Sequence, residues 1–163
     1  MHKIIVTGPE SSGKTTLCKA LSKHFNLPFS KESSREYLDA LNRDYNQDDL
    51  LKIAKGQLQA ENGIQLLDTD LITLKIWSEY KYGSCNKWIL SQIEKEKSEK
   101  RFYLLCKSDI PWEADPQREN PNNREELFEI YKTELESLGH TYFVVEGKDR
   151  VEKSISKISN LIS

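Results

Sequence analysis

A glycine-rich segment near the amino terminus constrains this chain more than any other feature. It reads Gly8-Pro9-Glu10-Ser11-Ser12-Gly13-Lys14-Thr15-Thr16, follows the apolar run Ile4-Ile5-Val6 and precedes a helical pattern. A strand, a G-x-x-x-x-G-K-[ST] loop and a helix in this order are typical of a phosphate-binding loop. Glycine at both ends lets the backbone curl so that its amides point inward, toward an anion. The sequence therefore predicts a nucleotide-binding protein.

Most residues of this loop have a predicted role at the nucleotide. We expect the backbone from Glu10 to Thr16, together with the positive end of the following helix, to bind phosphate oxygens. Lys14 is expected to place its charge between the β- and γ-phosphates, and the Thr15 hydroxyl to bind Mg²⁺. The predicted cofactors are therefore ATP and Mg²⁺.

Length and charge restrict the class of protein further. The 163 residues suit one domain with one core, predicted over 1–163, and the net charge of -2 gives no argument for nucleic acid or a membrane surface as partner. No stretch is apolar enough to span a membrane, and the first residues run into a strand without a signal-peptide pattern. The three widely spaced cysteines form no C-x-x-C pair. We expect reduced thiols in a cytoplasmic protein, with Cys18 and Cys106 packed as small apolar groups and no zinc site.

Apolar runs alternate with helical patterns along the whole chain. This alternation predicts an α/β fold with a parallel sheet that helices cover on both faces. The predicted strands cover 3–7, 27–30, 64–68, 101–106 and 141–145. The predicted helices cover the segment after the phosphate loop to about 25, then 33–41, 47–61, 71–82, 87–97, 121–138 and a last one from about 151.

Acidic and basic residues follow the predicted strands, where ligands of parallel sheets bind. Asp68 ends an apolar strand, the place from which a carboxylate assists Mg²⁺, and Asp70 is a second metal candidate. One of the two aspartates has the alternative role of a helix N-cap. Glu32 ends the second strand and is the candidate that accepts or orients the proton of an acceptor hydroxyl, with Arg35 binding the substrate. The alternative for Glu32 and Arg35 is a local ion pair at i, i+3, which would leave an aspartate as the base.

A polar segment, 107–124, has the composition of a lid. It carries Arg118 and Arg124, whose planar guanidinium groups fit phosphate, and three prolines that stiffen its path. Trp112 is expected to cover a substrate, because an exposed indole on such a segment needs something to pack against. The alternative is a solvated surface loop.

Together these motifs resemble one family. G-P-E-S-S-G-K-T-T, E-S-S-R-E-Y, the Gly56-Gln57 segment, L-L-D-T-D-L-I-T and D-I-P-W-E-A-D-P-x-R are similar to the ribosylnicotinamide kinase domain of the bifunctional bacterial NAD-salvage regulator and its small stand-alone relatives. The resemblance implies a nucleoside-kinase-like P-loop fold with a lid and a five-stranded sheet in the order 2-3-1-4-5. It implies ATP-dependent phosphorylation of nicotinamide riboside to nicotinamide mononucleotide. It also implies that Lys14, Glu32, Asp68 and Arg118 are catalytic.

The acceptor remains open in the sequence. The family has an aromatic residue just before the strand-two glutamate, where this chain has Lys31, and a cation does not stack on a pyridinium ring. Alternatives are a kinase for another nucleoside or small metabolite and a regulatory ATPase that takes no acceptor. A GTPase-like switch is disfavoured, because Cys106-Lys107-Ser108-Asp109 lacks the asparagine of the guanine motif N-K-x-D. Oligomeric state is not predicted.

Overall fold

A computed structural model describes residues 2–109 and 123–162. In these residues the chain forms a sheet of five parallel strands and seven helices. The strands are β1 (Lys3–Thr7), β2 (Phe29–Ser30), β3 (Leu66–Asp68), β4 (Arg101–Cys106) and β5 (Thr141–Val145). The helices are α1 (Lys14–Phe25), α2 (Ser34–Asp39), α3 (Gln47–Ala60), α4 (Leu71–Tyr82), α5 (Lys87–Glu96), α6 (Arg124–Ser137) and α7 (Arg150–Ile162).

The strand order is β2-β3-β1-β4-β5, which confirms the order that the resemblance implied. β1 is central and pairs in parallel with β3 and β4, so that Val6 lies opposite Asp68 on one side and Leu104 on the other. The carboxyl ends of these strands therefore meet next to the loop that follows β1. This arrangement brings Asp68 to the phosphate loop although 53 residues separate it from Thr15.

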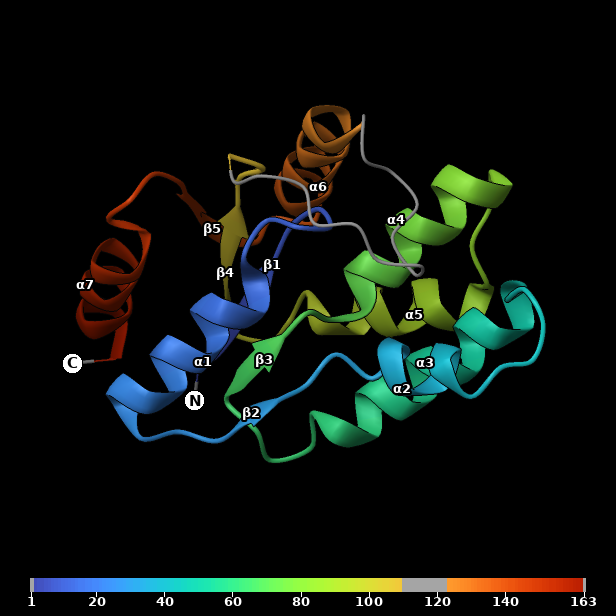
Figure 1. Cartoon of the computed structure of the whole chain (residues 1–163), viewed down its shortest axis with the longest axis horizontal. Helices are drawn as coiled ribbons and strands as arrows, with labels where there is room; N and C mark the ends of the chain where they lie inside the picture. Colours follow the sequence, from blue (N-terminus) through green and yellow to red (C-terminus); the bar gives the residue numbers. More distant parts are fainter. Residues whose placement is uncertain (1, 110–122, 163) are drawn as a thin grey trace.

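Two apolar layers cover the sheet, as the alternating pattern predicted. Ile4 and Val6 point to the face that α1 and α7 cover, while Ile5 points to the face that α3, α4, α5 and α6 cover (Figure 1). Successive side chains of a strand face opposite sides, so the middle of β1, Ile4 to Val6, is apolar at every position. The second face carries more helices, and α4 and α6 on that side supply part of the site described below.

The burial of two cysteines agrees with the sequence expectations. Cys18 and Cys106 are fully buried, and burial raises the pKa of the Cys106 thiol to about 12. Both therefore pack as small neutral groups. Within the described ranges, every helix is too short or too polar to cross a bilayer.

Candidate active site

The phosphate loop joins β1 to α1 at the carboxyl edge of the sheet, beside α4 and α6 (Figure 1). Gly8 has φ +141°, and a Cβ there would lie 2.6 Å from the carbonyl oxygen of Cys106 at the end of β4. Glycine is required because no side chain fits between loop and strand. Gly13, with φ +83°, is the N-cap of α1, so the loop ends on the positive end of a helix.

Hydrogen bonds inside the loop set its curvature. Ser12 Oγ donates to the Pro9 carbonyl at 2.7 Å. Lys14 Nζ donates to the carbonyls of Gly8 at 3.0 Å and Pro9 at 2.8 Å. The ammonium group therefore lies over the loop itself, at the place where phosphate oxygens would be its partners.

Thr15 and Asp68 form the candidate magnesium site. Thr15 Oγ1 donates to Asp68 Oδ2 at 2.9 Å, and Asp68 is 2% exposed. Burial raises the pKa of the Asp68 carboxyl, an effect that the Thr15 hydrogen bond opposes. A hydroxyl and a carboxylate oxygen are hard ligands of the kind Mg²⁺ prefers, and Mg²⁺ takes few ligands from protein when it binds with a nucleotide. Residues 2–109 and 123–162 hold no group of three His, Cys, Asp or Glu side chains that could bind a metal ion.

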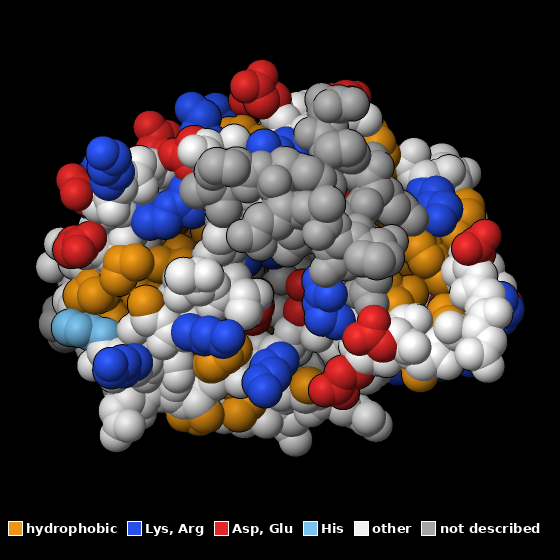
Figure 2. Space-filling view, viewed as in Figure 1, with side chains coloured by type: hydrophobic (Ala, Val, Ile, Leu, Met, Phe, Trp, Pro, Cys, Tyr) orange, Lys and Arg blue, Asp and Glu red, His pale blue; other side chains and the backbone are white. Residues whose placement is uncertain are grey.

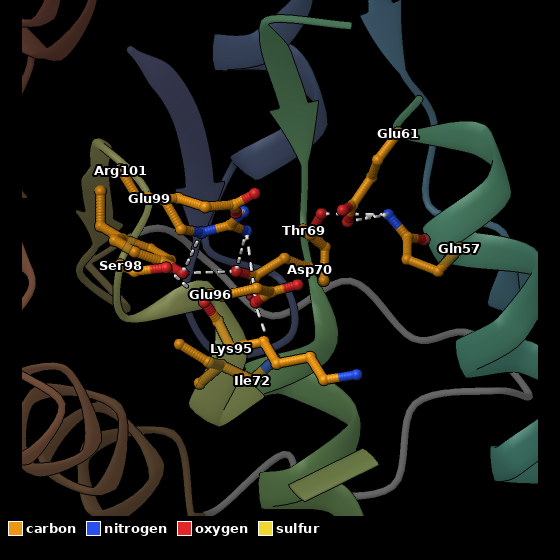
Figure 3. A network of polar contacts seen from close by, with 11 residues as sticks. Gln57, Glu61, Thr69, Asp70, Ile72, Lys95, Glu96, Ser98, Glu99 and Arg101 are labelled. Atoms are coloured by element: carbon orange, nitrogen blue, oxygen red, sulfur yellow. Dashed lines mark hydrogen bonds and ion pairs between the residues drawn. The ribbon is translucent and has the colours of Figure 1, made fainter. Parts of the chain in front are cut away.

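Asp70 does not share this site, and its prediction as a metal ligand is corrected. Its Oδ1 accepts from the Ile72 amide at 3.2 Å, which caps α4. Its Oδ2 accepts from Arg101 Nη2 at 2.8 Å and from the Tyr103 hydroxyl at 2.6 Å. Thr69, between the aspartates, has a left-handed backbone with φ +75°. After that turn the two side chains part: Asp68 contacts Thr15. Asp70 instead makes the buried contact with Arg101 (Figure 3).

A pocket extends from the phosphate loop toward α2, α4 and α6. In the space-filling view, a hollow near the centre of the molecule has acidic and basic side chains at its rim (Figure 2). Glu32 and Arg35, the residues that the sequence analysis assigned to the acceptor, are among those that line this pocket. Glu32 accepts a hydrogen bond from Ser34 Oγ at 3.1 Å. Its carboxylate thus lies in the pocket with the Ser34 hydroxyl as its partner.

The far part of the pocket is lined by residues that the sequence assigned to helices without a role, or to the core. Leu38, Thr73, Trp77 and Tyr131 belong to this lining. The Tyr131 hydroxyl donates to Thr73 Oγ1 at 3.1 Å, and burial raises its pKa. The sequence contains a pattern that could have identified two of these lining residues. Thr73 and Trp77 are i, i+4 neighbours, and so share one face of a helix that begins just after Asp68.

Two arginines contact the phosphate loop from the second half of the chain. Arg124, predicted to bind the nucleotide, donates to the Ser11 carbonyl at 3.2 Å from the start of α6. Arg150, which the sequence did not single out, donates to the Ser12 carbonyl at 2.7 Å from the start of α7. Arg150 could have been identified as a site residue from its position shortly after β5, because ligands of parallel sheets bind at the carboxyl ends of the strands. The other predicted lid residues, Arg118 and Trp112, lie outside the described residues.

Asp109 argues against the guanine-reading alternative. Its carboxylate accepts hydrogen bonds from the Gly147 amide at 2.7 Å and from Arg150 Nη2. The oxygens that would read a guanine edge are therefore used to join the segments after β4 and β5. This contact is a second argument against a GTPase-like switch.

The fold and the site together define a P-loop nucleotide-binding protein built like a nucleoside kinase. The chain belongs to the AAA_28 family, described as an AAA domain, whose pattern it matches over residues 3–153. This assignment fits the small kinase-like protein that the sequence resembled.

Similar proteins agree with that class. The chain is 26% identical over 164 residues to the trifunctional NAD biosynthesis/regulator protein NadR of Escherichia coli (strain K12), covering 91% of this chain and 39% of the relative. NadR protein in complex with NAD and AMP-PNP is similar in structure, with a TM-score of 0.73, 25% identity and coverage of 98% of this chain and 49% of that one. Deoxyadenosine kinase from M. mycoides, 14% identical, shares the fold with a TM-score of 0.68 over 99% of this chain and 100% of that one. The chain thus spans about two fifths of the curated relative's length and half of the NadR structure.

Proposed function

We propose that this protein transfers the γ-phosphoryl group of ATP to a hydroxyl of a nucleoside. One observation carries the proposal: a single pocket is lined at one end by the phosphate loop and at the other by Glu32, Arg35 and Trp77. A donor and an acceptor bound in that pocket are held next to each other. Holding two reactants in line supplies most of the catalysis in phosphoryl transfer.

The residues divide the work between donor and acceptor. Lys14 and the amides of the loop bind the phosphates, and Arg124 lies against the loop at Ser11. Thr15 and Asp68 would hold Mg²⁺, which when bound neutralises phosphate charge. Glu32 orients the acceptor hydroxyl and accepts its proton as the new bond to phosphorus forms. In this proposal two residues of the predicted lid complete the site: Arg118 supplies positive charge, and Trp112 covers the acceptor.

Nicotinamide riboside is the first acceptor to test. The similarity to NadR supports it, and so does the resemblance of the E-S-S-R-E-Y and D-T-D-L-I-T segments. Lys31 is exposed at the position where the family has an aromatic residue. Trp77 supplies an aromatic face to the pocket from α4 instead, which suits the flat ring of this or another nucleoside.

A nucleoside panel tests the proposal. Purified protein is incubated with Mg-ATP and each of several nucleosides, including nicotinamide riboside, and formation of ADP and of the nucleoside monophosphate is measured. We expect ADP formation that rises with one nucleoside and matches its monophosphate, and that is lost in Lys14→Ala. ATP consumption that no nucleoside or small hydroxyl compound stimulates would favour the regulatory ATPase and reject the proposal.

A further inference from the structure

Gln57 is a buried polar residue of α3 that does not line the pocket. It is 3% exposed, yet its side-chain amide makes four hydrogen bonds. Oε1 accepts from Ser33, from the backbone amide at 3.3 Å and from the hydroxyl at 3.2 Å. Nε2 donates to the Thr69 carbonyl and to Glu61 Oε1, each at 3.2 Å. Figure 3 shows this nitrogen pointing from α3 toward both partners.

The direction of the amide follows from its backbone partners. The Ser33 backbone N–H can only donate, so it requires the oxygen of Gln57. The Thr69 carbonyl can only accept, so it requires the nitrogen. A glutamine is the side chain that satisfies both at once, whereas glutamate lacks the donor and leucine lacks both groups.

The two ends of this bridge lie beside the two halves of the active site. Ser33 follows Glu32 and is the N-cap residue of α2, which carries Arg35. Thr69 follows Asp68, the partner of Thr15. Gln57 therefore connects the acceptor side of the pocket to the candidate magnesium side through one rigid amide.

The Thr69 end is held in an unfavourable conformation. Thr69 has φ +75°, a region that β-branched residues rarely adopt. Such a conformation persists only where surrounding contacts enforce it. Here the Thr69 amide donates to the Val6 carbonyl at 2.9 Å, and Gln57 holds the Thr69 carbonyl at 3.2 Å. Without Gln57, one of these two constraints on the turn that aims Asp68 is lost.

We propose that Gln57 is a positioning residue that sets Glu32 and Asp68 relative to each other, an inference that rests on the proposed kinase function. It touches neither substrate nor metal. It acts through Ser33 on the acceptor side and through Thr69 on the metal side.

Two substitutions separate the two arms. Gln57→Leu keeps the volume and removes all four hydrogen bonds. Gln57→Glu, made together with Glu61→Gln so that two buried carboxyls do not share a proton, keeps the acceptor for Ser33 and loses the donor to Thr69. Gln59→Leu, at an exposed position of the same helix, is the matched control. For each protein, at pH 8, we would measure thermal stability, kcat, the KM of the acceptor, and the Mg²⁺ concentration that half-saturates binding of a non-hydrolysable ATP analogue.

We expect both Gln57 variants to need about tenfold more Mg²⁺, the usual scale for losing a group that orients a metal ligand. Gln57→Leu should also raise the acceptor KM and lower kcat by about 10- to 100-fold, because a misplacement near 1 Å is enough for that loss. Gln57→Glu should keep the acceptor KM near that of the wild type, and Gln59→Leu should change nothing.

The proposal is overturned if folded Gln57→Leu retains Mg²⁺ affinity and kcat within twofold of the wild type. It is equally overturned if the losses in both variants follow their thermal stability and disappear on cooling, because that is the behaviour of a purely structural residue. If the wild type phosphorylates no nucleoside, the proposed function fails, and the Mg²⁺ titration still decides whether Gln57 acts on Asp68.

Discussion

At the scale of single residues, the site depends on where four charged side chains point. Lys14 lies over the phosphate loop, Asp68 contacts Thr15, and Glu32 and Arg35 line the pocket. The residue types and their places after the strands were sufficient to predict these positions. The N-cap role of Asp70 was one of the two alternatives for the aspartates. D-x-D spacing does not reveal which aspartate takes it, because the left-handed turn at Thr69 that separates them leaves no mark in the pattern.

Trp77 was missed for a related reason. Its spacing on α4 fits a residue that packs against the core, and it does pack against the core cluster while also lining the pocket. The periodicity of apolar residues identifies which face of a helix is buried. It does not distinguish a residue in the core from one in the wall of a pocket when core and pocket lie on the same side of the helix.

Replacing Glu32 with glutamine tests the predicted base. Glu32→Gln keeps the size and the hydrogen bond with Ser34 but cannot accept a proton. We expect turnover to fall by about 10²–10⁴-fold with the affinity for ATP unchanged. Steady-state kinetics beside a calorimetric measurement of ATP binding checks this. Glu36→Gln, at an exposed position of α2, should behave like the wild type. Weakened ATP binding in Glu32→Gln would instead assign Glu32 to the donor side.

Replacing Trp77 tests how the acceptor ring is bound. Stacking of a base on an aromatic side chain contributes about 1–3 kcal/mol. Trp77→Ala should therefore raise the KM of the acceptor about 5- to 150-fold and leave the KM of ATP unchanged, while Trp77→Phe should fall between it and the wild type. Equal effects on both substrates would show that Trp77 only supports the fold.

At the scale of elements, α2 is short and relies on α3 for its position. Asp49, in the first turn of α3, accepts from the Tyr37 hydroxyl at 2.7 Å and pairs with Arg43 at 2.7 Å. It also forms a reciprocal capping box with Asn46. The same carboxylate therefore starts α3 and fixes the helix that carries Arg35 beside the pocket.

Strand and helix bounds were predictable where apolar runs were continuous. β1, β4, α4 and β5 have the bounds that the pattern predicted. β2 is shorter than the predicted 27–30 and begins at Phe29, because Pro28 has no amide to donate to a ladder. Short edge elements depend on their neighbours, which a single-sequence pattern does not show.

Asp49→Asn should weaken the junction of α2 and α3. Loss of the carboxylate that pairs with Arg43, and of part of the capping box, should lower the free energy of unfolding by about 1–2 kcal/mol at pH 7. The hydrogen bonds of Arg43 hold the pKa of Asp49 well below its usual range, so the wild type has this stability above pH 4 and loses it as the pH falls further. Urea unfolding at pH 7 and pH 3 measures this, and the difference between the proteins should shrink at pH 3. Asp48→Asn, exposed and adjacent, is the control.

At the scale of the whole molecule, the resemblance predicted the order of the strands, but nothing in the sequence predicted the group of charged side chains that is buried beside the sheet. Arg101 and Asp70 form a fully buried ion pair at 2.8 Å, with Glu96 3.7 Å from the same guanidinium group (Figure 3). Burial raises the pKa of Glu61 to about 7 and that of Glu96 to about 8. Charged residues in a helical pattern normally indicate a face exposed to solvent, so no pattern in the sequence revealed that the carboxyl groups of Glu61 and Glu96 are buried.

These buried carboxyls predict lower stability in alkaline solution. A carboxyl with a raised pKa in the folded state stabilises the fold below its ordinary pKa, and this contribution is lost as the pH rises through the raised value. The melting temperature of the wild type should therefore fall between pH 5 and pH 8. Glu61→Gln removes the charge that must be buried and keeps an acceptor for Gln57. It should flatten this decline and raise the melting temperature at pH 8 by about 5 °C.

Melting curves at several pH values check this prediction. The exposed Glu94→Gln serves as control, since it changes the same chemical group without a buried charge. A Glu61→Gln protein that melts at or below the wild-type temperature at pH 8 would mean that the Glu61 carboxylate is stabilised when charged.

The contact between Arg150 and Ser12 joins residues 138 positions apart in the chain. A nascent chain emerges from the ribosome amino terminus first, so the phosphate loop is exposed long before α7 has been synthesised. In the first part of that interval β1 also lacks its partner β4 and the loop lacks Arg124, and the contact from Arg150 is added after both. Nucleotide-binding competence should therefore appear in a single step once α7 has emerged, rather than when the loop itself emerges.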